Sequence, residues 1–304
     1  MVAGLTQRVS GWLSTREFFA LVVPCLLFWS IVVLLLLHRF GSSGAHDRWT
    51  TLDPWTQVAV CATVVSTVTV STVIVSQLLT AVTRLFCGYG WHAWGMRWLA
   101  QRARRHQRQQ WARINSDHAS DVDQDRLYRC FPLSDGELQP TRLGNVLAAA
   151  ESYVRDDRRY GMDPVFFWPR LYPLLSDVLR SELAASRSAM DAMLVMSLLA
   201  GFLGGGVGVA GAAVHLSWPV QLITACAALL VSRLCYLAAV RTALGYAELV
   251  RASFDLHRRD LLRAMGVTLP ATLKAERALW KALGQQLYRR GADEEYLLRF
   301  DDGA

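Results

Sequence analysis

The sequence contains none of the short motifs that mark the commonest hydrolytic, zinc-dependent and nucleotide-binding sites. No HExxH, GxSxG or Walker motif occurs, and the seven histidines have no acidic or cysteine partner at ligand spacing. The spacing Asp121-Val-Asp-Gln-Asp125 resembles the start of a calcium loop, but Arg126 stands where that loop needs glycine and Pro132 where it needs glutamate. The sequence therefore predicts no metal, no cofactor and no enzymatic activity.

Lysine and cysteine are also scarce. Lys274 and Lys281 are the only lysines among 32 basic residues, so arginine supplies nearly all of the positive charge in a chain of net charge +7. The cysteines form no CxxC pair and no Cys/His set, which argues against a disulfide framework or a zinc site and favours small buried side chains. They are Cys25, Cys61, Cys87, Cys130, Cys226 and Cys235.

Long apolar runs, by contrast, are abundant. The four runs lie at 18–37, 56–84, 192–214 and 220–240. Because roughly 20 apolar residues in a helix cross a hydrocarbon core, and because lipid offers the backbone no hydrogen-bond partner, each run predicts a transmembrane helix. The predicted fold is an all-α polytopic membrane protein with four transmembrane helices in two hairpins, at 18–86 and 190–240.

The distribution of arginine predicts how these helices are oriented. Six arginines and no acidic residue lie between Arg84 and Arg108, which is typical of cytoplasmic segments beside a span. The chain is therefore expected to be a multi-pass protein of the inner (plasma) membrane, with both termini in the cytoplasm. Segment 1–17 would be a cytoplasmic N-terminal segment, and regions 87–189 and 241–304 would build a helical cytoplasmic domain.

The stretch after the second apolar run combines tryptophan with arginine. On a helix Trp91, Trp94 and Trp98 would share one face. The accompanying arginines are Arg97, Arg104, Arg105 and Arg108. Aromatic rings at the headgroup level with basic side chains toward anionic lipid define an interfacial helix. Because two membrane spans lie beside it, lipid is a better partner for this stretch than nucleic acid.

A stripe of hydroxyl groups follows the second apolar run. Its valine and threonine content suits a strand in water, but one strand cannot cross lipid alone, so a helix is predicted. On that helix Thr69, Thr72, Ser76 and Thr80 recur at spacings of three and four. Such a stripe can line an aqueous pore, and it can equally hydrogen-bond to its own helix or join two helices.

The last two apolar runs contain glycine pairs and one charge. Gly201 with Gly205, and Gly204 with Gly208, are GxxxG pairs, which favour close helix packing and would also permit a hinge. Arg233 either extends toward the interface, pairs with a carboxylate such as Asp191, or faces a water-filled path and attracts anions.

Further helices are predicted outside the apolar runs. Leu143 to Tyr153 has a helical pattern, Ser176 can cap a helix that continues into the third run, and Pro270 opens a last amphipathic helix. The fourth run has no helix breaker before Gly266.

Two segments are predicted to be non-helical. Residues 115–125 are polar and are expected to form a loop. The aromatic segment 163–173 is interrupted three times by proline, which predicts an extended conformation on the membrane surface or in a groove between subunits. Along the fourth run and its extension, Glu248–Arg251 and Asp255–Arg259 are expected to form ion pairs on the outer side.

Two groups of short blocks support a resemblance. The first comprises Pro140-Thr-Arg-Leu-Gly-Asn145, Arg159-Tyr-Gly-Met-Asp163 and Trp168-Pro-Arg-Leu171, and the second Phe254-Asp-Leu256, Leu279-Trp280 and Leu287-Tyr288-Arg289. They resemble a group of uncharacterised bacterial, often actinobacterial, integral membrane proteins, and the resemblance implies no particular activity. In topology alone the chain is similar to bacterial bestrophin-type chloride channels, which are ring-shaped oligomers and whose motifs do not occur here.

These patterns favour a homo-oligomeric membrane channel or pore that conducts anions. The hydroxyl stripe would line the path, Arg233 would attract anions, and Gly204 to Gly208 would allow movement. The alternative is a non-catalytic scaffold or anchor that recruits a cytoplasmic partner through 163–173. A membrane enzyme acting on lipids is the weakest hypothesis, because no acid, base and metal ligand converge in the sequence.

Overall fold

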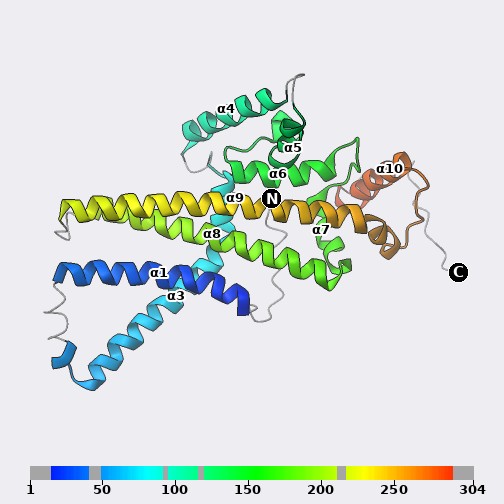
Figure 1. Ribbon diagram of the computed structural model, residues 1–304. Coiled ribbons are helices and arrows are strands. Elements are labelled where there is room, and N and C mark those ends of the chain that lie inside the picture. Colours follow the sequence, from blue (N-terminus) through cyan, green and yellow to red (C-terminus); the bar gives the residue numbers. More distant parts are fainter. Residues whose placement is uncertain (1–14, 41–48, 92–94, 116–119, 211–216, 290–304) are drawn as a thin grey trace. The chain divides into compact units, whose positions relative to one another are not determined.

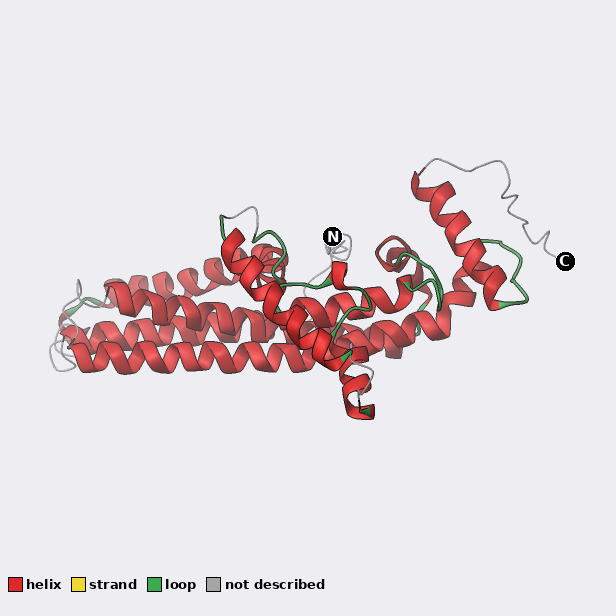
Figure 2. Ribbon diagram, turned by 90° about the horizontal axis from the view of Figure 1, so that it is seen from above, coloured by secondary structure: helices red, strands yellow, loops and turns green. Residues whose placement is uncertain are grey.

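The computed structural model describes residues 15–40, 49–91, 95–115, 120–210 and 217–289, and their regular secondary structure is helical, with no strand among them (Figures 1 and 2). The prediction of an all-α chain is confirmed. Three helices are long and apolar enough to cross a membrane: α3 (Pro54–Cys87), α8 (Asp177–Ala210) and α9 (Trp218–Ala264). The helix α1 (Thr15–Phe40) has a shorter apolar stretch, Leu21–Leu37.

The helix α3 forms despite a composition that suits strands. Asp53 caps its first turn, accepting a hydrogen bond from the Thr56 amide at 3.0 Å, and Pro54 occupies the first helical position. Along the helix, the hydroxyls donate to backbone carbonyls of the preceding turn, as Thr69 does to Val65 at 2.9 Å. The helix therefore satisfies its own polar groups, as a helix in lipid requires.

The chain divides into two compact units. The apolar-helix unit comprises the described residues of Ser10–Thr83 and Ser188–Ala239, and the helical unit comprises those of Arg84–Arg187 and Val240–Ala304. Both α8 and α9 begin or end in one unit and continue into the other.

The helices of the apolar-helix unit contact one another through a small apolar cluster and a pair of serine side chains. Leu203, Val207 and Ala228 form a buried cluster with side chains of α1 packed against it. The hydroxyls of Ser197 and Ser232 each donate to the other residue's carbonyl, at 2.9 and 2.7 Å. Much of the unit's apolar surface is left uncovered, most plainly on the N-terminal part of α3, which diverges from α1 in Figure 1.

The helical unit is built from shorter elements and contains a large aromatic core and a smaller cluster of Ile114, Phe131 and Leu138. The elements are α4 (Arg97–Ile114), α5 (Asp121–Cys130), the 3-10 turn η2 (Asp135–Glu137), α6 (Arg142–Arg155), α7 (Pro164–Leu171), the 3-10 turn η3 (Tyr172–Leu174), α10 (Leu273–Gly284) and the π-helical turn η4 (Gln285–Arg289), together with the ends of α8 and α9. In its core, the ring centroids of Phe167 and Trp280 lie 5.0 Å apart, and those of Trp168 and Phe254 lie 5.7 Å apart.

The prediction that 163–173 is extended is wrong. Asp163 caps α7 by accepting from the Val165 amide at 3.0 Å, and Pro164 follows at the first helical position, where its missing N–H costs nothing. Pro169 does lie inside the helix, but the helix ends two residues later. Phe167, Trp168 and Leu171 are buried in the core, whereas Pro169, Arg170 and Tyr172 are exposed.

Two other boundaries differ from the predictions. Part of the polar stretch 115–125 is helical, because Ser120 and Asp123 form a capping box at the start of α5. The last helix begins at Leu273 with Thr272 as its cap, not at Pro270. The predictions that Ser176 caps α8 and that α9 is uninterrupted until Gly266 are confirmed.

Glycines allow the last turn of α3 to lie against the start of α6. A Cβ atom on Gly144 would lie 2.2 Å from the Cys87 carbonyl oxygen, and one on Gly88 would lie 2.8 Å from the ring of Pro140. Gly88 also has a φ of 82°, which side-chain-bearing residues rarely adopt. The last turn of α3, which belongs to the helical unit from Arg84 onward, therefore packs closely on the start of α6.

Candidate functional site: an arginine–tyrosine cluster

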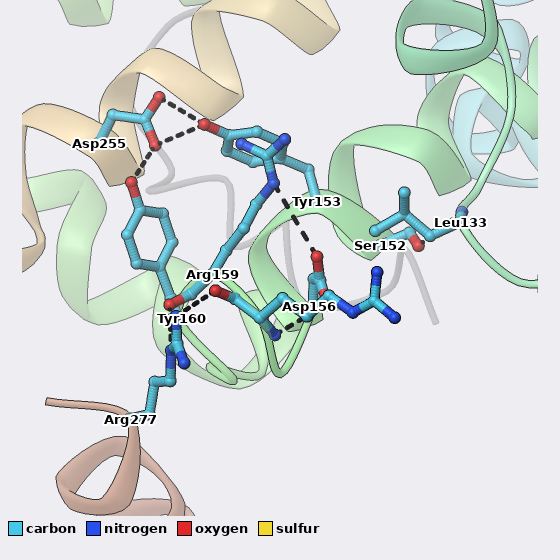
Figure 3. Close-up of polar contacts among 9 residues, drawn as sticks. Leu133, Ser152, Tyr153, Asp156, Arg159, Tyr160, Asp255 and Arg277 are labelled. Carbon is cyan, nitrogen blue, oxygen red and sulfur yellow. Dashed lines mark hydrogen bonds and ion pairs between the residues drawn. The ribbon is translucent and has the colours of Figure 1, made fainter. Parts of the chain in front are cut away.

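Polar side chains gather within the helical unit, in a group that we call the Arg–Tyr cluster, in which Tyr153 and Arg251 are buried and the other side chains are partly exposed. It consists of Tyr128, Tyr153, Arg159, Tyr160, Arg251 and Asp255, which come from α5, α6, the turn that follows α6, and α9 (Figure 3 shows four of them).

Asp255 is the acceptor at the centre of this cluster. The Tyr160 hydroxyl donates to its Oδ1 at 2.8 Å, and the Tyr153 hydroxyl donates to Oδ2 at 3.0 Å and to Oδ1 at 3.2 Å (Figure 3). Burial, together with the hydrogen bonds to Asp255 and its negative charge, raises the pKa of both tyrosines. Both phenols therefore stay protonated at neutral pH and act as donors, not as bases.

Two guanidinium groups stack on the tyrosine rings. The Cζ atom of Arg159 lies 4.0 Å from the ring centroid of Tyr153, and that of Arg251 lies 4.4 Å from the ring centroid of Tyr128. The two rings are themselves in edge contact, with centroids 5.7 Å apart. A guanidinium over an aromatic face within about 6 Å is stabilised by the ring's quadrupole, more strongly where water is excluded.

Arg251 is the most deeply buried charge of the cluster, with 1% of its surface exposed. Its guanidinium donates to the Tyr128 carbonyl at 2.9 Å and to Glu248 at 3.0 Å. The predicted Glu248–Arg251 pair is thus confirmed, but Arg251 does not lie on the outer side of the helix. Its positive charge is partly balanced by the side-chain carboxylate of Glu248, which remains 58% exposed.

A second set of contacts attaches α10 to the cluster. Arg258 stacks on Tyr160 and donates from Nε to Glu276 at 2.8 Å, and the Trp280 indole donates to the same carboxylate at 3.3 Å. Arg277 donates from Nε to the Arg159 carbonyl at 2.8 Å, a contact visible in Figure 3. The predicted Asp255–Arg259 pair is not formed, because Asp255 is engaged by the two tyrosines.

The Arg–Tyr cluster acts as a brace, meaning that its side chains hold several segments of the chain together. Each phenol in contact with Asp255 is a protonated donor, and the guanidiniums of Arg159, Arg251 and Arg258 are engaged by rings, carbonyls and carboxylates. Among the residues that the structure describes, no group of three or more His, Cys, Asp and Glu side chains is placed to hold a metal ion. The cluster connects four segments of chain and holds them in one arrangement.

The hydroxyl stripe does not form a single uncovered face. Thr69 is exposed, Thr80 is half-buried, and Thr72 and Ser76 are buried within the apolar-helix unit. Thr72 donates to the Val68 carbonyl at 2.8 Å and Ser76 to that of Val73 at 2.7 Å. At these two positions the geometry supports the packing alternative.

The glycines and Arg233 also differ in their surroundings. Gly204 lies against α9, since a Cβ there would be 2.9 Å from Leu229 Cγ and 3.1 Å from the Ala225 carbonyl oxygen. A Cβ on Gly201 would meet Ser232 at 3.4 Å, whereas one on Gly205 or Gly208 would meet nothing within 4 Å.

Arg233 is exposed on the apolar part of α9. Its guanidinium lies 5.7 Å from the ring centroid of Tyr236.

The residues expected at a lipid interface fall into different parts of the chain. Trp91 lies in the turn after α3, where its indole donates to the Leu85 carbonyl at 2.8 Å, and Trp94 lies outside the described residues. Within α4, Arg97, Trp98, Arg104 and Arg105 are exposed, while Arg108 is paired with Asp135. Trp91 and Trp98 therefore do not share one helix.

Comparison of the chain with protein-family models, with curated proteins and with solved structures found no match. The function of the chain is therefore inferred from its own geometry.

Proposed function

We propose that the chain is a non-catalytic membrane scaffold, in which apolar helices act as the anchor and the helical unit recruits a partner protein. The observation that carries this proposal is α9, one helix of 47 residues. Its first part is apolar, and its second part supplies Arg251, Asp255 and Arg258 to the brace. The proposed membrane anchor and the part of the chain that would recruit a partner are thus joined by a single helix.

The Arg–Tyr cluster supports a recruiting role because it fixes the shape of the unit. A surface that is already ordered before binding loses less conformational freedom when a partner docks. The cluster orders segments that are 95 and 102 residues apart, through the bonds from Tyr160 and Tyr153 to Asp255.

Proximity labelling in the native membrane tests the scaffold. A biotin ligase fused to the wild type is compared with the same fusion carrying Asp255→Ala, which removes the acceptor of both tyrosines. The control is Asp260→Ala, whose carboxylate is partly exposed and contacts His257 and Arg263. We expect wild type and control to label the same proteins and Asp255→Ala to lose them while remaining in the membrane. An identical set from all three chains would contradict the proposal.

A pore is the second candidate, and exposed Arg233 is the observation that favours it. A charged side chain at the centre of a membrane helix costs about 2.5–3.5 kcal/mol on insertion scales, so a second subunit or a water-filled path that covers it would stabilise the protein. Thr69 is likewise uncovered on α3.

The pore is tested by particle mass and by ion flux. Light scattering in nanodiscs should give a ring of several subunits, and liposomes should release chloride faster than potassium. Arg233→Gln should lower that preference, and Thr63→Val, at another exposed threonine of α3, should leave it unchanged. A monomer, or no flux above empty liposomes, would remove the pore hypothesis.

A further inference from the structure

The helix α4 has two faces of opposite character. Its 18 residues include six arginines and no acidic residue. Its inner face packs on the helical unit through Ala100, Gln107 and Ile114, which are buried, and the Asn145 side chain donates to Gln107 at 3.1 Å. The opposite face of α4 therefore points away from the helical unit.

That outward face places an aromatic ring among arginines. Trp98 is 70% exposed, and the guanidinium of Arg102 lies 6.0 Å from its ring centroid. Arg105 follows three residues later and Arg113 further along the same side, and all three arginines are exposed. Arg108, by contrast, is neutralised by Asp135 from η2. Arg102, Arg105 and Arg113 thus share with Trp98 the side of the helix that faces away from the unit.

The chain keeps this face near the end of an apolar helix. Residues 88–96 are the only link between Cys87, the last residue of α3, and Arg97, the first of α4. At no more than roughly 3.5 Å per residue, the ten steps from Cys87 to Arg97 reach at most about 35 Å. Since α3 is long and apolar enough to span a bilayer, α4 begins within that distance of the end of a candidate membrane helix.

We infer that the outward face of α4 docks on anionic phospholipid headgroups. Arg102 and Arg105 bind headgroup phosphates, and Trp98 inserts its ring at the boundary between headgroups and acyl chains, where amphipathic aromatic side chains are most stable. The inference needs only that the chain is membrane-anchored, so it stands or fails independently of the scaffold and the pore.

Amide hydrogen exchange on the full chain tests this docking. The protein is placed in nanodiscs of phosphatidylcholine alone, or of phosphatidylcholine and phosphatidylglycerol in a two-to-one mixture. The test variant is Arg102→Gln with Arg105→Gln. The matched control is Arg259→Gln with Arg263→Gln, which removes the same charge from exposed positions of α9.

In the wild type, α4 amides should exchange more slowly with phosphatidylglycerol present, and high salt should reduce the difference. The test variant should weaken docking on the order of thirtyfold and abolish the slowing, whereas the control should keep it. Unchanged exchange of α6 would show that the unit remains folded. Equal α4 exchange in both wild-type discs, or slowing that survives in the test variant, would overturn the inference. So would stronger protection by single-stranded RNA added to phosphatidylcholine discs, which would assign the face to nucleic acid.

Discussion

The two units of this chain are held together by different kinds of contact. In the helical unit, aromatic side chains are buried in one large core, and arginines and tyrosines connect segments as far apart as Tyr128 and Arg251. In the apolar-helix unit, neighbouring helices meet through a serine pair and through the close approach at Gly204, and large apolar side chains point outward.

The difference corresponds to the medium that each surface suits. Burying a large aromatic side chain stabilises a protein only where the alternative is water, so it is an effective device in the helical unit. Between helices in lipid that driving force is absent, and close packing with short hydrogen bonds takes its place. Substitutions in each unit, and at the exit of α3, test this comparison.

The largest effect is expected in the aromatic core. Phe254 is fully buried and Leu256, two residues along the same helix, is 69% exposed. Phe254→Ala should lower the free energy of unfolding by about 3–5 kcal/mol, and Leu256→Ala by less than about 0.5 kcal/mol. Denaturant unfolding in nanodiscs, followed by near-UV circular dichroism, measures both. Equal losses would mean that this core does not stabilise the unit.

The next effect concerns the contact between the last turn of α3 and the start of α6, both within the helical unit. Gly144→Ala should destabilise by about 1–3 kcal/mol, because its Cβ would overlap the Cys87 carbonyl oxygen, and backbone must move to relieve the overlap. Gly136→Ala is the control, since a Cβ there meets nothing within 4 Å. Thermal unfolding of the two variants should separate them, and similar melting temperatures would count against this close packing of Gly144 on Cys87.

The Arg–Tyr cluster predicts sensitivity to alkaline pH. Because the pKa of Tyr153 and Tyr160 is raised in the folded chain, the unfolded chain loses these protons first, from about pH 10. Stability that is complete below that pH should then fall as pH rises toward the folded-state pKa values. A chain with Tyr153→Phe and Tyr160→Phe should lose less stability between pH 9 and pH 11 than the wild type.

At neutral pH, Tyr160→Phe should cost about 1 kcal/mol for the lost bond to Asp255. Unfolding curves collected across the pH series give both quantities. The same dependence of stability on pH in the wild type and the double variant would show that folding does not raise the pKa of these tyrosines.

The smallest predicted effects are at two adjacent glycines of α8, where the same substitution should change stability in opposite directions. Gly204→Ala should weaken helix packing by about 1 kcal/mol, because its Cβ would press on Leu229 and on the Ala225 carbonyl. Gly205→Ala should stabilise by up to about 1 kcal/mol, because it gains helix propensity and has open space. Thermal unfolding in nanodiscs, with helicity as the signal, compares them. Two changes of the same sign would contradict the close approach of α8 to α9 at Gly204.

Local patterns predicted much of the fold. Apolar periodicity and the positions of helix breakers predicted the all-helical fold class, the cap at Ser176 and the continuity of α9. The error at 163–173 arose from counting prolines without their positions, since Pro164 at a helix start is favourable.

The Arg–Tyr cluster could not be predicted from spacing. Asp255 has Arg259 four residues away, yet its partners are Tyr153 and Tyr160, and only the folded chain brings them together. The one available signal was Glu248–Arg251, a pair whose spacing is correct but whose burial depends on the tyrosine rings.

The helical unit is discontinuous in the chain, and this has a consequence for biosynthesis. Tyr153 is made 102 residues before Asp255, and the sequence between them includes the whole of α8 and the apolar part of α9. At about 5–20 residues per second, the ribosome needs roughly 5–20 s to supply the missing half. During that interval Phe167 and Trp168 lack their partners from α9 and α10. Nascent chains stalled in this window should bind chaperones, and release should follow synthesis of α10.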